Sequence, residues 1–325
     1  MSAPVHMAVW CEFLPYPDVI PLLPELARRG LGLHLAVQAG RAGEPALFDL
    51  LARARDLGVE VRAWVLLAPE EGYWPNAWNA GHWAELALAF ADRAALRGTP
   101  PAWVIADLEP PPERISALAG ALAARRWREA WRLAADLPAA GGAGDGAALR
   151  GAIANLQARG IRVQAVTLPL ALDGPFADRL LAGLGVDFLA LPWDEVSFMA
   201  YRPEFARLAG PLGADLVGSY AADAVARFGP RASLAIGEVG SPGFPAPVAG
   251  YTDPAELQAD LAACRAARLP AISIFSLDGL LQQGGLARWL DAAPAAAPRP
   301  SPRSALVRLA VATACLLLPD PDRRE

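Results

Sequence analysis

Short apolar runs alternate with longer amphipathic segments between residues 6 and 290. Eight runs rich in β-branched or aromatic residues begin at His6, Gly32, Val61, Ala102, Ile161, Val196, Ser233 and Ala271. Stretches of alanine, leucine and arginine separate them; in residues 82–98, for example, apolar side chains recur on one helical stripe before a terminal glycine. This alternation is typical of repeated βα units.

Eight consecutive βα units predict a closed (β/α)₈ barrel, the TIM barrel, rather than an open doubly wound sheet. The first run is followed by WCEFLPYPD and not by Gly-x-Gly-x-x-Gly, so the dinucleotide-binding fold is not supported. The glycine-rich segment GGAGDG from Gly141 lies between helical stretches. We therefore expect it to be a surface loop and not a phosphate-binding loop.

The chain divides into a barrel and a short C-terminal extension. We predict a barrel domain over residues 1–291, a Pro/Ala-rich linker over 292–303 and a tail over 304–325. The apolar run 309–318 is about half of the roughly 20 residues that cross a bilayer. It predicts a buried or peripheral helix, with membrane contact as the alternative. No secretory signal pattern opens the sequence, which favours a cytoplasmic protein.

Composition removes several functional classes. The 325 residues are 54% hydrophobic with a net charge of −5, which argues against extended disorder and against nucleic-acid binding. All 29 basic residues are arginines, so chemistry that depends on a lysine is excluded, including Schiff-base aldolases and pyridoxal-phosphate enzymes.

Histidine and cysteine usage narrows the choice further. The three histidines, at positions 6, 34 and 82, share no metal-ligand spacing, and we expect neither a metal nor a cofactor. The three cysteines, at positions 11, 264 and 315, are widely scattered. They predict buried thiols rather than a disulfide framework.

Acidic and aromatic residues gather where the predicted strands end, and that end of a TIM barrel carries the chemistry. The predicted site residues are Glu12 after the first strand, Asp107 and Glu109 at the fourth, Tyr201 and Arg202 after the sixth, Glu238 after the seventh and Asp278 after the eighth. The third strand runs into the loop EEGYWPNAWN, which adds Trp74, Asn76 and Trp78.

This set of side chains predicts a carbohydrate ligand. Flat aromatic rings stack on sugar faces, acids and amides bind hydroxyl groups, and two carboxyl groups suffice to cleave a glycosidic bond. Asp107 and Glu109 lie two residues apart on one strand face, so mutual repulsion raises the pKa of at least one of them. A raised pKa suits a general acid at neutral pH.

Three segments resemble family 18 glycoside hydrolases, the chitinase group. WVIADLEPP with Asp107 and Glu109 resembles the end of the fourth-strand Asp-x-x-Asp-x-Asp-x-Glu motif, VSFMAYRP with Tyr201 resembles the sixth-strand Met-x-Tyr, and ISIFSLDGL resembles the eighth-strand run. The resemblance implies Glu109 as general acid, Asp107 as the residue that orients an N-acetyl group, and Tyr201 as its support. Ala102 and Ile105 replace the motif's earlier aspartates, and Phe275 its eighth-strand tryptophan.

A second resemblance competes with the first. LAIGEVGSP around Glu238 is similar to the seventh-strand nucleophile segment of the retaining (β/α)₈ glycosidase clan, in which the acid/base glutamate ends the fourth strand. It implies double displacement, with Glu238 attacking and Glu109 alternating between acid and base.

Three functions therefore stay open. Retaining hydrolysis of a glycosidic bond is the favoured one, and a non-catalytic carbohydrate-binding barrel descended from a glycosidase is the alternative. A barrel enzyme of different chemistry, such as a lyase acting on a modified sugar, is the third.

Overall fold

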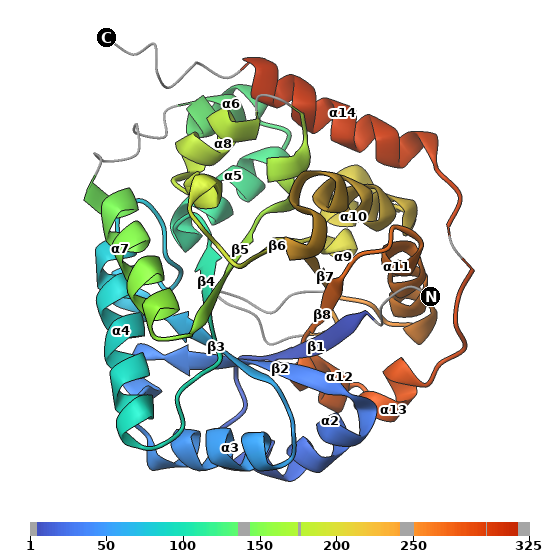
Figure 1. Ribbon diagram of the computed structural model, residues 1–325. Coiled ribbons are helices and arrows are strands. Elements are labelled where there is room, and N and C mark those ends of the chain that lie inside the picture. The colour runs from blue at the N-terminus through green and yellow to red at the C-terminus, as the bar shows by residue number, and fades with distance from the viewer. Residues whose placement is uncertain (1–4, 136–143, 175–176, 241–249, 297, 318–325) are drawn as a thin grey trace.

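The computed structural model describes residues 5–135, 144–174, 177–240, 250–296 and 298–317 (Figure 1). Its centre is a closed barrel in which each strand pairs in parallel with the next, and β8 pairs with β1. The strands are β1 His6–Cys11, β2 Leu31–Gln38, β3 Val61–Leu66, β4 Trp103–Leu108, β5 Arg162–Thr167, β6 Glu195–Met199, β7 Ala232–Gly237 and β8 Ala271–Phe275. The predicted TIM barrel is confirmed, and each predicted run overlaps one strand.

Helices surround the barrel and fill the connections between successive strands (Figure 1). They are α1 Tyr16–Val19, α2 Leu23–Arg29, α3 Pro45–Asp56, α4 Ala80–Leu96, α5 Pro112–Ala123, α6 Trp127–Ala135, α7 Gly144–Ala158, α8 Ala177–Leu184, α9 Arg202–Ala209, α10 Asp215–Phe228, α11 Pro254–Ala266, α12 Leu277–Gln282, α13 Gly285–Leu290 and α14 Pro302–Leu317.

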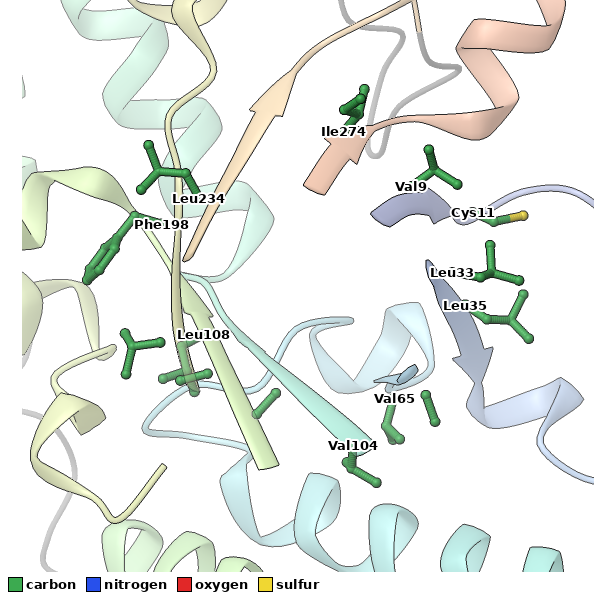
Figure 2. Packing of buried hydrophobic residues seen from close by; sticks show 14 of the residues in the cluster. Val9, Cys11, Leu33, Leu35, Val65, Val104, Leu108, Phe198, Leu234 and Ile274 are labelled. Atoms are coloured by element: carbon green, nitrogen blue, oxygen red, sulfur yellow. The ribbon is translucent and has the colours of Figure 1, made fainter. Parts of the chain in front are cut away.

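The outer face of each strand carries small branched apolar residues that pack under the helices. Val9, Leu33, Val65, Val104 and Ile274 are all fully buried in this shell (Figure 2). Because parallel strands of a barrel are covered on one face and filled on the other, both sets of alternating positions are buried. This explains why the sequence shows continuous apolar runs at the strands.

The barrel interior is layered along its axis. Its middle layer is apolar and largely aromatic, and it contains Trp10, Trp64, Ile105, Val166, Met199 and Phe275. Ile105 lies two residues before Asp107 on β4, so the aromatic layer lies directly beneath the carboxyl-bearing strand ends. A packed interior of this kind is usual for TIM barrels.

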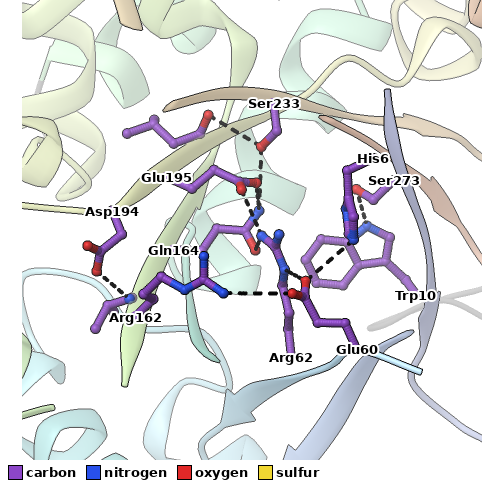
Figure 3. Close-up of polar contacts among 12 residues, drawn as sticks. His6, Trp10, Glu60, Arg62, Arg162, Gln164, Asp194, Glu195, Ser233 and Ser273 are labelled. Atoms are coloured by element: carbon purple, nitrogen blue, oxygen red, sulfur yellow. Dashed lines mark hydrogen bonds and ion pairs between the residues drawn. The ribbon is translucent and has the colours of Figure 1, made fainter. Parts of the chain in front are cut away.

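A polar network fills the opposite, N-terminal end of the interior (Figure 3). The buried guanidinium of Arg62 pairs with Glu195 at 2.9 Å and donates to Gln164 at 3.2 Å. Gln164 in turn donates to Glu195 at 2.9 Å. A buried charge without such partners is strongly destabilising, so each member of the network depends on the others.

The C-terminal extension returns to the barrel as α14. Arg308 forms ion pairs with the buried Asp173 and with Asp223, each at 2.7 Å, and its guanidinium lies over the ring of Tyr220. The helix begins at Pro302, within the predicted linker, and it covers α8 and α10. No described helix is long and apolar enough to cross a membrane.

Other sequence expectations have mixed outcomes. All three cysteines are buried free thiols, as predicted. The stripe over residues 82–98 is confirmed as α4. The surface-loop prediction for the glycine-rich segment is wrong for Gly144 and Gly146, which lie in the first turn of α7, while residues 141–143 lie outside the described part of the chain.

Removing one partner of the buried network should destabilise the fold. We expect Glu195→Ala to lower the free energy of unfolding by about 3 kcal/mol, because it leaves the buried Arg62 charge short of a partner. Urea denaturation measures the change. Glu25→Ala, which breaks surface ion pairs with Arg28 and Arg29, should leave the midpoint unchanged. Equal effects of the two substitutions would contradict the structural role of the network.

Candidate active site

The candidate site lies at the C-terminal ends of the strands, above the aromatic layer. Four carboxyl groups reach it from three parts of the barrel: Glu12 directly follows β1, Asp107 lies on β4, Glu109 directly follows β4 and Glu238 directly follows β7. Glu12, Asp107 and Glu238 are buried, whereas Glu109 is partly exposed. The sequence places them far apart, and barrel closure brings them to one end.

Burial makes all four carboxyl groups unusually weak acids, and the charges of neighbouring acidic groups add to its effect at Glu12, Glu109 and Glu238. Burial, the first cause in each case, raises the pKa of Glu12 and of Asp107 to about 8, and the neighbouring indole N–H of Trp64 offsets part of the rise at Asp107. The pKa of Glu109 is raised well above its ordinary value by burial and then by the charges of Asp107, Glu12 and Glu238. The pKa of Glu109 therefore depends on the charges of the other three carboxyl groups.

Tyr201 lies among the same carboxyl groups. It immediately precedes α9 and is partly exposed, and its ring centroid is 5.7 Å from that of Phe275. Burial and the charges of Asp107, Glu238, Glu109 and Glu12 raise the pKa of its hydroxyl well above the ordinary value. Tyr201 is thus a neutral hydroxyl within the carboxyl cluster at any physiological pH.

Residues around Glu12 hold it in position: Asp278 and Trp74 are predicted site residues, and Tyr73 is added by the structure. Tyr73 donates its hydroxyl hydrogen to Glu12 Oε1 at 2.7 Å. Asp278 accepts from the backbone N–H groups of Glu12 and Phe13, at 3.2 and 3.1 Å, so its carboxylate holds the end of β1. The buried Trp74 stacks edge-on against Tyr73, with ring centroids 5.3 Å apart, and belongs to the interior aromatic cluster.

Three other predicted binding residues make their described contacts outside the cluster. Asn76 uses its amide within its own loop, donating to Trp74 O and accepting from Trp78 N. Trp78, 37% exposed, lies under the guanidinium of Arg114. The guanidinium of Arg202 is bound to Asp260 of α11 at 3.0 Å and to the backbone oxygen of Leu212. Their roles in binding a ligand stay predictions.

The structure adds neighbours that the sequence reasoning did not select. Glu204, in the first turn of α9, raises the pKa of Glu238 beyond the effect of burial, and Arg207 lowers it, leaving it at about 8. Glu204 and Arg207 form an ion pair at 2.9 Å. The signal for Glu204 was its place three residues after Tyr201, because the first turn after a barrel strand faces the same rim.

Two oxygens in the cluster have no hydrogen-bond partner. Asp107 Oδ1 and Glu238 Oε2 are buried and make no hydrogen bond, and the same holds for the indole N–H of Trp64, the neighbour that lowers the pKa of Asp107. Buried polar atoms are normally paired, and exceptions are concentrated at functional sites. No group of three or more His, Cys, Asp or Glu side chains in the described ranges is arranged to hold a metal ion.

A groove of about 840 Å³ lies elsewhere, between the C-terminal segment and helices α10 and α11. Its polar lining includes Asp173 and Asp223, each of which forms an ion pair with Arg308. We regard this groove as the joint between α14 and the barrel. The strand-end carboxyl groups remain the candidate site.

Comparisons with known proteins establish the fold and no family. No family profile matches the chain, and no curated protein matches its sequence. Among solved structures, an endo-β-1,4-mannanase from Thermotoga petrophila aligns with 10% identity over 99% of this chain and 78% of that chain, at a TM-score of 0.52. The β-glycosidase BGL167 aligns with 12% identity over 94% and 86%, at 0.51.

A chitinase domain from Pyrococcus furiosus also aligns, with 10% identity over 96% of this chain and 97% of that chain, at a TM-score of 0.47. At such identities the likeness extends to the barrel alone. The class defined by the fold is the TIM barrel, which is shared with glycosidases.

The raised pKa of Asp107 carries a stability cost that a substitution should remove. Between the ordinary value of 3.8 and about 8 the folded protein binds a proton that the unfolded chain does not, so this group destabilises the fold as pH rises. We expect Asp107→Asn to raise the free energy of unfolding by about 1 kcal/mol or more near pH 8, and much less near pH 5. Denaturation at both pH values measures the difference.

The control is Asp56→Asn, which changes an exposed carboxylate at the end of α3. It should have no such pH-dependent effect. A destabilising effect of Asp107→Asn at the higher pH would contradict the assignment of Asp107 as a desolvated, uncompensated carboxyl group.

Proposed function

We propose that the protein is a glycosidase-like TIM barrel that hydrolyses a glycosidic bond with retention of configuration. One observation carries the proposal: carboxyl groups from the ends of β1, β4 and β7 gather around Tyr201, and the charges of the other three raise the pKa of Glu109. Cleavage of a glycosidic bond needs one carboxylic acid that keeps its proton at neutral pH and one carboxylate on the other side of the bond.

The different surroundings of the carboxyl groups assign their roles. Burial and then the charges of three neighbouring acidic groups raise the pKa of Glu109 well above its ordinary value, which suits the general acid. Glu238 has Arg207 as a partial counter-charge and a pKa of about 8, which suits the group that ionises and attacks the anomeric carbon. Glu109, left as a carboxylate after it protonates the leaving oxygen, then takes a proton from the water that releases the sugar.

Asp107 and Tyr201 complete the proposed machinery. Asp107 lies two residues before Glu109, on the same side of the chain at the end of β4, and once it ionises its charge raises the pKa of Glu109. The neutral hydroxyl of Tyr201 can donate a hydrogen bond to the ring oxygen or to the attacking carboxylate. Trp74, Asn76, Trp78, Glu12, Arg202 and Asp278 stay predicted substrate-binding or supporting residues.

The alternative is a carbohydrate-binding barrel without activity. It is favoured by Ile105, which fills the apolar interior layer where the family 18 motif has an aspartate. If the alternative holds, a wild-type protein that turns over no glycoside should still gain thermal stability from oligosaccharides.

Removing the proposed acid tests catalysis directly. We expect Glu109→Gln to lower turnover of glycosides with poor leaving groups by roughly 10²- to 10⁴-fold while leaving oligosaccharide affinity nearly unchanged. Initial rates and calorimetric binding measure the two quantities. Glu113→Gln, four residues further on an exposed position of α5, is the matched control. Full activity in the Glu109 variant would contradict the assignment.

The pH profile tests the proposed nucleophile. Because the attacking form is the carboxylate and the pKa of Glu238 is about 8, kcat/KM should rise with pH through about 8. It should fall again when Glu109 loses its proton at still higher pH. An ascending limb in the ordinary carboxylate range would show that Glu238 is not the group that must ionise.

A further inference from the structure

Two residues of the proposed machinery are connected to one buried carboxyl group outside the site. Tyr201 immediately precedes α9, and Glu238 immediately follows β7. Helices α9 and α11 both contact β7 (Figure 1). Asp260 lies on α11, and its side chain is completely buried. Its carboxylate accepts hydrogen bonds from two residues, one of which follows Tyr201 while the other contacts the backbone of Glu238.

Asp260 holds the start of α9 through Arg202, the residue after Tyr201. The Nε of Arg202 donates to the carboxylate of Asp260, at 3.0 Å to Oδ1 and 3.2 Å to Oδ2. The other guanidinium nitrogens donate to the backbone oxygens of Leu212 and Glu256, at 3.1 and 3.3 Å. A planar guanidinium bound on several sides has little freedom to turn. The backbone next to Tyr201 is therefore fixed relative to α11.

Asp260 holds the segment after β7 through Tyr251. The buried hydroxyl of Tyr251 donates to Asp260 Oδ2, and the guanidinium carbon of Arg202 lies 5.0 Å from the centroid of the Tyr251 ring. The backbone N–H of Tyr251 donates to the backbone oxygen of Glu238 at 2.6 Å. The hydroxyl group thus fixes the ring, the ring fixes the backbone of Tyr251, and that backbone fixes the carbonyl group of Glu238.

Close backbone packing makes the segment that carries Glu238 sensitive to its neighbours. A Cβ atom on Gly250 would collide with the backbone oxygen of Glu238, and one on Gly279 would collide with that of Val239. The backbone N–H of Val239 also donates to the backbone oxygen of Phe275 at 2.9 Å, which connects the segment to β8. A displacement of the backbone next to Gly250 is therefore transmitted to Glu238, because no free space absorbs it.

We propose that Asp260 is a positioning residue that fixes Tyr201 and Glu238 relative to each other, with Arg202 and Tyr251 as the residues that connect it to them. This inference rests on the proposed function, in which the hydroxyl of Tyr201 donates to the attacking carboxylate or to the sugar. Placement of reacting groups is a large part of catalysis, and a misplacement of about 1 Å costs on the order of 100-fold in rate.

A second arginine–aspartate–tyrosine set with the same contacts provides a matched control. Asp173 accepts from Arg308 at 2.7 Å and from the hydroxyl of Tyr220 at 2.8 Å. The guanidinium carbon of Arg308 lies 4.3 Å from the centroid of the Tyr220 ring. This set connects α14 with α10 and with the segment after β5. Tyr220 and Tyr251 are 0% and 1% exposed, so Tyr220→Phe and Tyr251→Phe each remove one buried hydroxyl group from equivalent surroundings.

Titration of the Glu238 carboxyl group tests the inference without a substrate. The full-length protein is isotopically labelled at the glutamate carboxyl carbons and titrated by NMR, and Glu238→Gln identifies the signal. Burial and Glu204, in the first turn of α9, raise the pKa of Glu238 to about 8. Loosening of α9 and of the segment after β7 admits water and lets Glu204 move away, and both changes lower this pKa. We expect a fall of about half a unit or more in Tyr251→Phe and none in Tyr220→Phe.

Kinetics on a panel of aryl glycosides test the role in the reaction. We expect Tyr251→Phe to lower kcat about tenfold with KM nearly unchanged, and Tyr220→Phe to keep both. Urea denaturation should show similar losses of unfolding free energy in the two variants, because each loses one buried hydrogen bond. Asp260→Asn and Asp173→Asn repeat the comparison at the carboxyl groups, with the larger fall of kcat expected in the first.

The outcomes distinguish the two proposals. A pKa of Glu238 that stays at the wild-type value in Tyr251→Phe, or falls equally in Tyr220→Phe, overturns the positioning inference, and so does an unchanged kcat in Tyr251→Phe. Turnover by the wild type supports the glycosidase proposal in each of these cases. If the wild type cleaves no glycoside, the proposed function fails, whereas a fall of the Glu238 pKa in Tyr251→Phe alone still supports the control of Glu238 by Asp260.

Discussion

The removal of water from the strand-end carboxyl groups is the constraint on which the rest of the site depends. The interior aromatic layer, with Trp10, Trp64 and Phe275, closes the barrel beneath Asp107 and leaves its carboxyl group in surroundings where ionisation is costly. A solvated cluster of the same four acids would ionise together at neutral pH and could not keep a proton for a leaving oxygen. The apolar filling of the barrel is therefore part of the proposed chemistry and not only of its stability.

The two ends of the barrel interior differ in how far their buried acidic groups are paired. At the N-terminal end, Arg62 and Glu195 neutralise each other, and Gln164 completes their hydrogen bonds. At the C-terminal end, the acids accumulate with little compensation, and oxygens of Asp107 and Glu238 stay unpaired. The first arrangement pairs its buried charges, whereas the second lowers stability as the pH rises, because the folded state holds protons that the unfolded chain releases.

The sequence predicts the fold well because its signals are local. Eight apolar runs at regular intervals need only their own periodicity to be identified as strands, and barrel closure then brings Glu12, Asp107 and Glu238 to one rim. The direction in which a long side chain points is set by its tertiary contacts and not by the neighbouring sequence. Arg202 follows the sixth strand as expected, yet its guanidinium is bound to Asp260, fifty-eight residues later. The proximity of Glu204 to Glu238, like the hydrogen bond from Tyr73 to Glu12, is equally a product of tertiary packing.

Helix α14, the last helix of the described residues, docks away from the seam that closes the barrel. The seam is the β1–β8 pairing, while α14 is fastened through Arg308 to Asp173, in the connection after β5, and to Asp223 on α10. The C-terminal segment is further held by Arg303, whose guanidinium donates to the backbone oxygen of Ala209, and by the backbone N–H of Ser301, which donates to Asp215. A segment attached in this way can be lengthened or replaced during evolution without breaking the β1–β8 pairing that closes the barrel.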